Sequence, residues 1–339
     1  MQTNQFKGVV IMLITVLIWG GTFPVAKGAL LTLDAFWMSS IRYCVAALLF
    51  VAILSWREGA AALRYRGKIP QASFFGVMGF TGFSILVFVG LARSSPEHAA
   101  IIMALQTPIA AFVHWALKGT RPANFTLACV AVAILGVFMV ITKGDPVHAF
   151  AGDTFFGDVL IFLGAMCWIT YTIGAVSFPG WSALRFTTLT CLPGTVGVLV
   201  ATAIATLSGY ASIPTGATLV SVGWELAYLA LLNVVLAVLF WNMAIGYLGA
   251  LNAMLLGNLV PVVTFAIRIL QGHRFEAIEL AGAGLVVVAL IANNLYLRGR
   301  IVTPASYRRV NVLPSRPLTR IGWHKRGLFR VGFAESDIG

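Results

Sequence analysis

Residues 124–142 read NFTLACVAVAILGVFMVIT, nineteen consecutive positions without Asp, Glu, Lys or Arg. An α-helix rises about 1.5 Å per residue, so this run would be about 28 Å long, close to the thickness of the hydrocarbon layer of a bilayer. Arg121 precedes the run and Lys143 follows it, so charge marks both ends. The run therefore predicts a helix that crosses a membrane.

Nine further runs of similar length carry few or no charges. They cover residues 8–27, 35–55, 72–92, 98–117, 156–176, 184–207, 223–246, 250–270 and 277–297. A transmembrane β-barrel is the weaker interpretation, because apolar residues are continuous in these runs, whereas barrel strands alternate over about ten residues. The sequence predicts an all-α membrane protein with ten transmembrane helices.

The composition supports this class, since 59% of the 339 residues are apolar, 10% are charged and the mean hydropathy is +0.92. A soluble domain of this length would cover its surface with charge. The first run follows Lys7 and so permits a secretory signal peptide. It continues past Trp19 without a small-residue cleavage site before Lys27, which favours a retained helix.

The distribution of Lys and Arg predicts the orientation, because cytoplasmic loops near helix ends accumulate these residues. If the N-terminus lies inside, 17 of the 23 basic residues fall on the cytoplasmic side, 5 fall near the other side, and Arg42 lies within a run. We therefore expect both termini in the cytoplasm.

The segment 298–339 carries nine Lys and Arg and two acids, which is +7 of the net charge of +12. A nucleic-acid-binding arm is one interpretation. A basic segment directly after a last membrane helix more often lies against anionic lipid headgroups, so no nucleic-acid partner is expected. Pro304, Pro314 and Pro317 interrupt the segment, which shows no helical periodicity, and we expect it to be a poorly ordered cytoplasmic tail.

The two halves of the chain resemble each other at a shift of 153 residues. The matched pairs around the fourth and ninth runs are Pro108 and Pro261, Phe112 and Phe265, Gly119 and Gly272, and Arg121 and Arg274. Five helices per half is an odd number, so the second half must enter the membrane in the opposite orientation. We expect two inverted five-helix repeats, residues 1–145 and 153–297, an architecture that can expose a midplane site to each side in turn.

Two motifs resemble a known family. Trp19-Gly20-Gly21-Thr22-Phe23 resembles the W-G-x-x-F signature of the drug/metabolite transporter superfamily, EamA branch. Gly157-Asp158-Val159-Leu160, leading to Cys167-Trp168 and Tyr171, resembles the start of the second EamA repeat, and the stretch after Arg42 is similar to the second helix of that family. The family usually ends its fourth and ninth helices with Gly-Glu, whereas this chain has Gly119-Thr120 and Gly272-His273, which weakens any role for those acids.

The resemblance implies a secondary transporter in a bacterial inner membrane that exports small organic metabolites, such as amino acids or related amphipathic compounds, by alternating access. It does not identify the substrate. An enzyme is not expected, because the sequence contains no P-loop, H-E-x-x-H or G-x-S-x-G motif. An intramembrane lipid-modifying enzyme and a sensor or scaffold without transport activity remain alternatives. No obligate protein partner is predicted.

Polar and aromatic residues near the middle of the predicted helices are the candidates for the substrate site. They are Trp19, Gln106, Thr107, Trp168, Asn233 and Asn258. Amides that faced lipid would lack hydrogen-bond partners, so they should face the protein interior, either at substrate or in bonds between helices. We expect substrate contacts from Trp19, Gln106, Trp168 and Asn258, and from Tyr171 beside Trp168.

Arg42 and two prolines complete the expected site. Arg42 lies about 10 Å below the predicted outer surface, where it would bind an anionic group of the substrate or, alternatively, extend to the surface or to helix-end carbonyls. Pro108 and Pro261 should interrupt their helices near Gln106 and Asn258, and would serve gating or packing. Each of the four cysteines lies in a separate run, so neither a metal site nor a cofactor is expected.

Overall fold

The computed structural model describes residues 2–106, 108, 109, 112, 115, 119, 121–145, 152–248, 253 and 256–302. The expected tail from residue 303 onward, Thr107, and parts of the fourth and ninth runs lie outside this set. Every regular element among the described residues is helical, and none of them forms a strand. This confirms the predicted all-α class.

The helices follow the predicted runs closely. Their bounds are α1 Gln2–Ala29, α2 Ala35–Glu58, α3 Ile69–Gly76, η2 Val77–Gly82, α4 Phe83–Arg93, α5 Pro96–Ala104, α7 Asn124–Thr142, α9 Asp153–Gly174, α10 Ala183–Leu207, α11 Gly216–Ser221, α12 Gly223–Ala227, η4 Tyr228–Leu236, α13 Ala237–Leu248, α15 Val260–Leu270 and α16 Ala277–Val302. Two short 3₁₀ turns, η1 Ala60–Leu63 and η3 Ala175–Ser177, follow α2 and α9.

Eight helices in the described part of the chain are long and apolar enough to cross a membrane. They are Gln5–Ala29, Ala35–Glu58, Ile69–Arg93, Asn124–Thr142, Asp153–Gly174, Ala183–Leu207, Gly223–Leu248 and Ala277–Leu297. The fourth and ninth predicted helices are represented by the shorter α5 and α15, next to residues outside the described set. The chain is therefore a multi-pass membrane protein.

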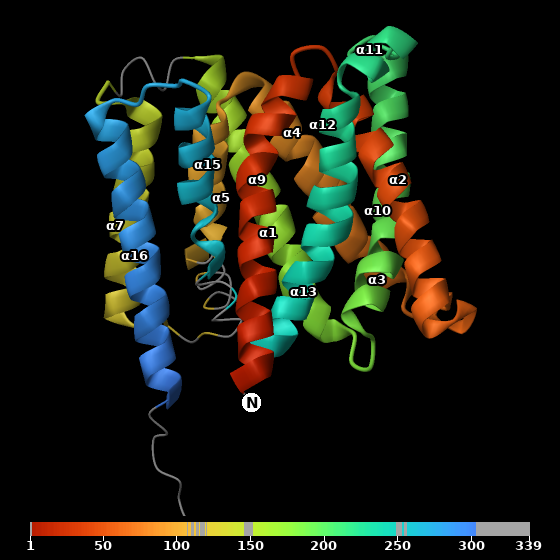
Figure 1. Cartoon of the computed structure of the whole chain (residues 1–339), viewed down its shortest axis with the longest axis horizontal. Helices are drawn as coiled ribbons and strands as arrows, with labels where there is room; N and C mark the ends of the chain where they lie inside the picture. The colour runs from red at the N-terminus through yellow and green to blue at the C-terminus, as the bar shows by residue number, and fades with distance from the viewer. Residues whose placement is uncertain are drawn as a thin grey trace, which may run out of the picture. The chain divides into compact units, whose positions relative to one another are not determined.

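The helices run roughly alongside one another between two faces (Figure 1). We call the face where α1 ends and α2 begins the turn face, and the face where α1 begins and α16 ends the terminal face. At the turn face, Lys27 near the end of α1 bonds to Leu91 O at the end of α4, and Ser94 bonds to Asp158 near the start of α9. Because α9 begins at the face where α1 ends, the second repeat is inverted.

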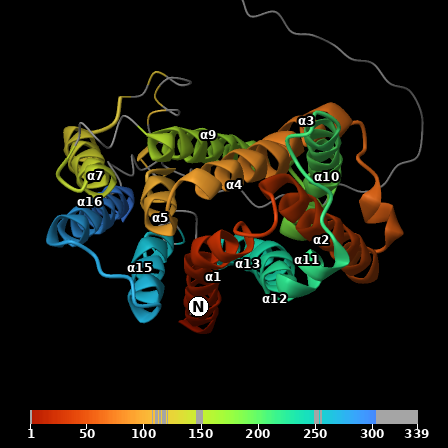
Figure 2. The same cartoon turned by 90° about the horizontal axis from the view of Figure 1, so that it is seen from above.

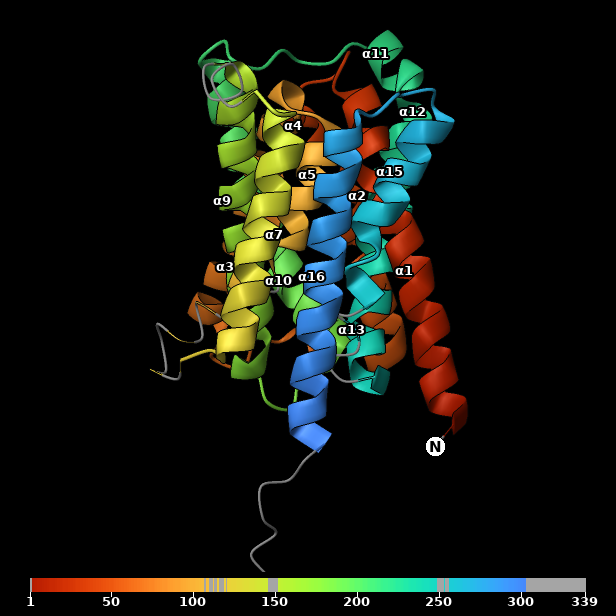
Figure 3. The same cartoon turned by 90° about the vertical axis from the view of Figure 1, so that its left-hand side faces the viewer.

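Helices from the two repeats pack in matching pairs. The pairs α1 with α13 and α4 with α9 are equivalent, since each joins the first helix of one repeat to the third of the other. The second helices pair as α2 with α10, and the fifth as α7 with α16, which lie side by side at one edge of the bundle (Figures 2 and 3). Any site enclosed by these helix pairs is therefore formed by residues of both repeats.

Glycines allow two of these pairs to approach closely. A Cβ atom on Gly90 of α4 would lie 2.5 Å from Gly157 O of α9, and one on Gly157 would lie 2.6 Å from Gly90 O. Gly136 and Gly282 make the same reciprocal contact between α7 and α16. In a bilayer, where no hydrophobic effect drives helices together, such close backbone packing contributes strongly to association.

The third helix of each repeat contains a π-helical segment. It is η2 between α3 and α4 in the first repeat, and η4 between α12 and α13 in the second. The wider π turn shifts the side chains that follow it around the helix axis, and such segments frequently occur at functional sites. The recurrence in both repeats places the two segments symmetrically beside the interior of the bundle.

Candidate functional site

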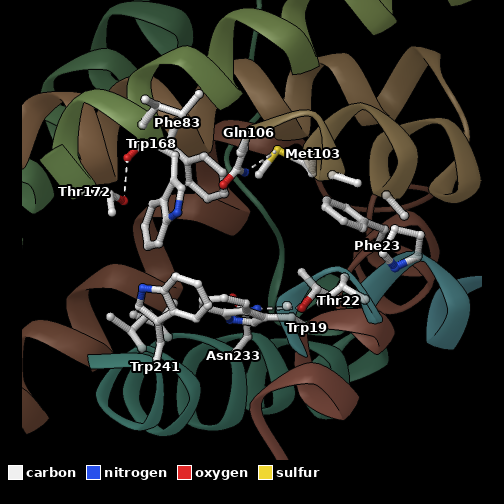
Figure 4. A pocket seen from close by; sticks show the side chains of 18 of the residues that line it. Trp19, Thr22, Phe23, Phe83, Met103, Gln106, Trp168, Thr172, Asn233 and Trp241 are labelled. Atoms are coloured by element: carbon white, nitrogen blue, oxygen red, sulfur yellow. Dashed lines mark hydrogen bonds between the residues drawn. The ribbon is translucent and has the colours of Figure 1, made fainter. Parts of the chain in front are cut away.

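A cavity of about 180 Å³ lies between two groups of helices. One wall comes from η2, α4, α5 and α9, and the other from α1, η4, α13 and α15, with Tyr43 contributed by α2. The lining residues are Trp19, Thr22, Phe23, Tyr43, Phe80, Phe83, Phe88, Ala100, Met103, Ala104, Gln106, Trp168, Ile169, Thr172, Ile173, Asn233, Val234, Val238, Trp241, Gly257, Asn258, Val260 and Pro261. Figure 4 shows Phe83, Trp168 and Gln106 facing Trp19, Trp241 and Asn233 across it.

The Trp19–Phe23 motif explains how α1 forms its part of the wall. A Cβ on Gly20 would lie 2.5 Å from Val263 Cβ of α15, and one on Gly21 would lie 2.5 Å from Tyr228 Oη of η4, so only glycine admits these neighbours. Tyr228 Oη donates to Ile18 O at 2.6 Å. The two glycines thus allow α15 and η4 to pack closely against α1. The side chain of Trp19, from the same motif, lines the cavity.

Three tryptophans dominate the cavity wall. The Trp19 ring meets Trp168 edge to face, with centroids 6.2 Å apart, and lies 5.2 Å from Trp241. Phe83 supports Trp168 from α4, with ring centroids 5.1 Å apart. Aromatic groups pack well against other planar apolar surfaces, so this wall suits a ligand with a flat apolar part.

Three amides also line the cavity. Asn233 Nδ2 donates to Thr22 Oγ1 at 2.5 Å, while Gln106 Nε2 contacts the weak acceptor Met103 Sδ at 3.4 Å. Asn258 is only 4% exposed, and its Nδ2 has no hydrogen-bond partner among the described residues. Gln106 and Asn258 therefore retain donor capacity toward the cavity.

The helix interruptions lie beside the two expected prolines. α5 ends at Ala104, followed by a turn at Leu105, and a turn at Asn258 and Leu259 precedes α15. Pro261 stands in the first turn of α15, where its missing N–H leaves no intrahelical bond unmade, and lines the cavity. Pro108 is buried and does not line it.

Arg42 is buried directly behind the wall and is 1% exposed. Its Nη2 donates to Tyr43 Oη at 3.0 Å and to Ser84 Oγ at 2.9 Å, and its Nη1 lies 3.5 Å from Asn233 Oδ1. The guanidinium also lies 4.3 Å from the centre of the Phe88 ring. The guanidinium does not extend to the surface or to helix-end carbonyls; it contacts three residues of the wall instead.

Tyr171 supports the wall from behind. Its ring lies 5.2 Å from Trp168 and 5.3 Å from Phe80, and it does not line the cavity. A Cβ on Gly79 would lie 2.4 Å from the Tyr171 ring, so the π segment η2 provides the room for this side chain. Tyr171 is therefore positioned to orient Trp168.

Charged contacts close the bundle at the turn face. Lys27 Nζ donates to the carbonyls of Leu91, Ala92 and Ser94 at 2.9, 3.0 and 2.7 Å, which joins α1 to the end of α4. The Glu97 carboxylate is 2% exposed and accepts from Arg268 Nε at 3.2 Å, which joins α5 to α15. Both contacts link the two groups of helices that form the cavity walls.

Glu97 stands at the start of a well-capped helix. Ser95 Oγ accepts from His98 N, Pro96 occupies the first turn, and the acidic Glu97 lies where the helix dipole favours negative charge. His98 Nδ1 lies 3.0 Å from Asp158 Oδ2, and Ser94 bonds to the other carboxylate oxygen. The local sequence thus fixes two buried carboxylate contacts near the turn face.

The comparisons with known proteins agree with this architecture. The model of the EamA-like transporter family matches residues 6–142 and again residues 155–295. The chain belongs to the EamA-like transporter family. A Bacillus subtilis (strain 168) protein described as the uncharacterized transporter YrdR is 36% identical over 297 residues, covering 86% of this chain and 92% of that protein.

Two further comparisons extend the result. The B. subtilis (strain 168) protein YyaM, also described as an uncharacterized transporter, is 29% identical over 282 residues, covering 82% of this chain and 90% of that protein. A solved crystal structure aligns with a TM-score of 0.60 at 18% identity, covering 87% of this chain and 99% of that chain, and shows the fold alone. The family and these relatives indicate a membrane transporter rather than an enzyme.

Several residues of this EamA-like site were not among the sequence-based candidates. Trp241 and Phe83 line the cavity, and Glu97 and Arg268 join its two walls at the turn face. His273, where the family usually has Glu, has its Nε2 3.5 Å from Glu97 Oε1. Sequence spacing carried no signal for these pairings, because each joins different repeats or distant helices. Among the described residues, no group of three or more His, Cys, Asp or Glu could hold a metal ion.

Proposed function

We propose that this protein exports small amphipathic organic metabolites, amino acids or related compounds, from the cytoplasm by alternating access. The cavity between helices of opposite repeats carries this proposal. Its walls belong to two groups of helices, so a relative movement of the groups would expose the cavity first to one face and then to the other.

The described contacts favour a state closed at the turn face. Lys27 and the Glu97–Arg268 pair join the two walls at this face, and they lie closer to it than the contact between Trp19 and Trp168. For alternation, these contacts must break when the turn face opens. Charged groups suit this role, because water solvates them once the face opens, whereas their separation while they are buried is costly.

The direct test is flux in proteoliposomes. Purified protein is reconstituted, and entry of a panel of labelled amphipathic metabolites is measured against protein-free vesicles. We expect saturable flux of at least one compound and acceleration of that flux by unlabelled compound on the opposite side. Lack of flux for the whole panel, combined with turnover of lipid, would favour the alternative of an intramembrane enzyme.

Two glycine variants test whether transport uses the cavity. Gly257 lines it, and a Cβ there would have its nearest neighbours at 3.5 Å, so Gly257→Leu should fold and fill part of the space. Gly284 of α16 has open space around it and does not line the cavity, so Gly284→Leu is the matched control. We expect Gly257→Leu alone to reduce flux by at least about tenfold, which corresponds to about 1.4 kcal/mol.

We also propose an inner-membrane location with both termini in the cytoplasm and the basic tail against anionic headgroups. The tail's excess of Lys and Arg supports this, since each basic residue near an anionic surface contributes about 1 kcal/mol. Trypsin, which cleaves after Lys and Arg, should cut the tail of the full-length protein more slowly in liposomes with anionic lipid than in neutral ones. Equal cleavage rates would contradict this role of the tail.

A further inference from the structure

The cavity wall is rich in aromatic groups and lacks charge. Among the 23 described lining residues there is no Asp, Glu, Lys, Arg or His. Its polar side chains are neutral hydroxyls and amides. A ligand with a net charge would therefore need a compensating charge close behind this wall, because burial of an unpaired ion is expensive.

Arg42 is such a charge, and no acid in the described part of the chain compensates it. Its partners among the described residues are the hydroxyls of Tyr43 and Ser84, the amide of Asn233, and the faces of two aromatic rings. In the described part of the chain the Nε atom has no hydrogen-bond partner, and the contact of Nη1 with Asn233 Oδ1 is long at 3.5 Å. The guanidinium is thus buried, cationic and incompletely bonded.

Three buried acids form ion pairs with other residues, and Glu225 Oε2, which has no hydrogen-bond partner among the described residues, lies on α12, eight positions before Asn233. Glu97 pairs with Arg268, Asp158 with His98, and Glu279 with Lys143, whose Nζ lies 3.0 Å from Glu279 Oε1. All three contacts lie near the turn face rather than beside Arg42. Among the described residues, no acid forms an ion pair or a hydrogen bond with Arg42.

Three of the residues that contact Arg42 also line the cavity. They are Tyr43, Phe88 and Asn233. Asn233 is the most direct link, because its Oδ1 faces Arg42 and its Nδ2 faces Thr22 at the wall. The charge of Arg42 thus acts on the cavity across a single layer of side chains.

Two amide N–H groups at the cavity are donors without a strong acceptor among the described residues. Asn258 Nδ2 is buried without a partner, and Gln106 Nε2 contacts only a thioether sulfur among the described residues. An acceptor group on the ligand would satisfy them, whereas an ammonium group would meet donors and a buried cation. Donors beside a cation favour a carboxylate or a similar anionic group.

We propose that the transported substrate is an organic anion with a planar apolar part. The planar part packs among Trp19, Trp168 and Trp241, and the anionic group lies toward Asn233 and the charge of Arg42. A compound whose only charge is an ammonium group is excluded. This inference rests on the proposed transport function, whose substrate class it narrows.

The test is binding to the purified full-length protein, measured by isothermal titration calorimetry. Three probes share one phenylpropyl framework and differ in charge: 3-phenylpropionate, 3-phenylpropionamide and 3-phenylpropylamine. We expect the carboxylate to bind at least about tenfold more tightly than the amide, and the amine not to bind. Equal or tighter binding of the amine would overturn the inference.

A charge substitution then tests the role of Arg42. Asn233→Asp places a carboxylate of the same shape against the guanidinium and should preserve folding, since it pairs a buried cation. We expect it to weaken binding of 3-phenylpropionate at least about tenfold. Arg42→Gln should have the same effect if it folds.

Asn242→Asp is the matched control. Asn242 lies on α13, bonds to Thr187 Oγ1 at 2.9 Å and does not line the cavity. It adds the same charge without contacting Arg42, so binding should change little. If Asn233→Asp binds the anion as the parent protein does, Arg42 only joins α2, α4 and η4, and the inference fails.

The measurement separates this inference from transport itself. Calorimetry requires no flux, so binding of the anion without flux of any compound would contradict the proposed function alone. Flux of the amine at a rate equal to that of the carboxylate would contradict the substrate class alone.

Discussion

The indole rings of Trp19 and Trp168 meet edge to face, with centroids 6.2 Å apart and ring planes at 89°. Each tryptophan stands on the first helix of its repeat, 149 positions from the other in the chain. Their contact crosses from one wall of the cavity to the other. Any movement that separates the walls must break it.

Removal of Trp168 should impair transport more than folding. We expect Trp168→Ala to reduce kcat/KM for flux by about tenfold or more, because the ring lines the cavity and supports Trp19. Trp56→Ala is the control, since Trp56 is 79% exposed at the end of α2 and lies away from the cavity. Unchanged kinetics in Trp168→Ala would remove this residue from the substrate site.

Loss of the Glu97 carboxylate should weaken the closure at the turn face. Glu97→Gln leaves Arg268 without its acid partner, and removal of one member of a buried pair costs about 3–5 kcal/mol. The Arg268 side chain is 25% exposed, against 3% for Glu97, so water partly solvates the unpaired cation and the lower end of this range is expected. We expect a lower apparent melting temperature in detergent and altered flux.

The matched variants for this pair are Glu276→Gln and a charge exchange. Glu276 is exposed near the same face, so its substitution should leave the melting temperature unchanged. The double variant Glu97→Arg with Arg268→Glu should recover part of the stability lost in either single variant. No recovery, together with a stable Glu97→Gln protein, would show that the pair does not hold the walls together.

Substitution at the Gly90–Gly157 contact should destabilise the bundle. A Cβ on either residue would lie 2.5–2.6 Å from a backbone oxygen of the other helix, so α4 and α9 must move apart. We expect Gly157→Ala to cost about 1–3 kcal/mol, the range for overpacking. Gly284→Ala, in open space on α16, should be neutral or stabilising because alanine favours helix. Melting temperatures in detergent compare the two.

Reporter fusions test the orientation predicted from charge. Green fluorescent protein fused after residue 339 should fluoresce, because it folds in the cytoplasm, and alkaline phosphatase at the same place should be inactive. The reverse pattern is expected for fusions in the 208–215 connection at the turn face. Active phosphatase at the C-terminus would contradict the cytoplasmic location of the terminal face.

The two inverted repeats could be predicted because membrane spanning is a local property. About twenty apolar residues in sequence are sufficient to cross a bilayer as a helix, whatever the rest of the chain does. The paired prolines and the Trp19 motif also marked the interior, since Trp19, Trp168, Gln106, Asn258 and Pro261 all line the cavity. Whether they bind substrate is a prediction for the experiments above.

The π segments were not predictable from periodicity, because η2 and η4 are short, wider stretches of six and nine residues within otherwise apolar runs. The position of the Tyr171 ring was not predictable either. The motif indicated that Tyr171 lies near Trp168, but the ring packs against the π segment behind the cavity wall and does not line the cavity. A side chain's depth in a bundle depends on neighbours from other helices. Single-helix patterns do not contain that information.

The sequence alone predicted the membrane crossings, since hydrophobicity acts on each helix separately, and the positions of Lys and Arg add a prediction of their orientation. Only the tertiary structure decided that Arg42 lies behind Asn233 with no acid partner among the described residues, and that Glu97 meets Arg268 across the two walls. These contacts join residues 191 and 171 positions apart. Their energies depend on distance and burial, which exist only once the helices have packed.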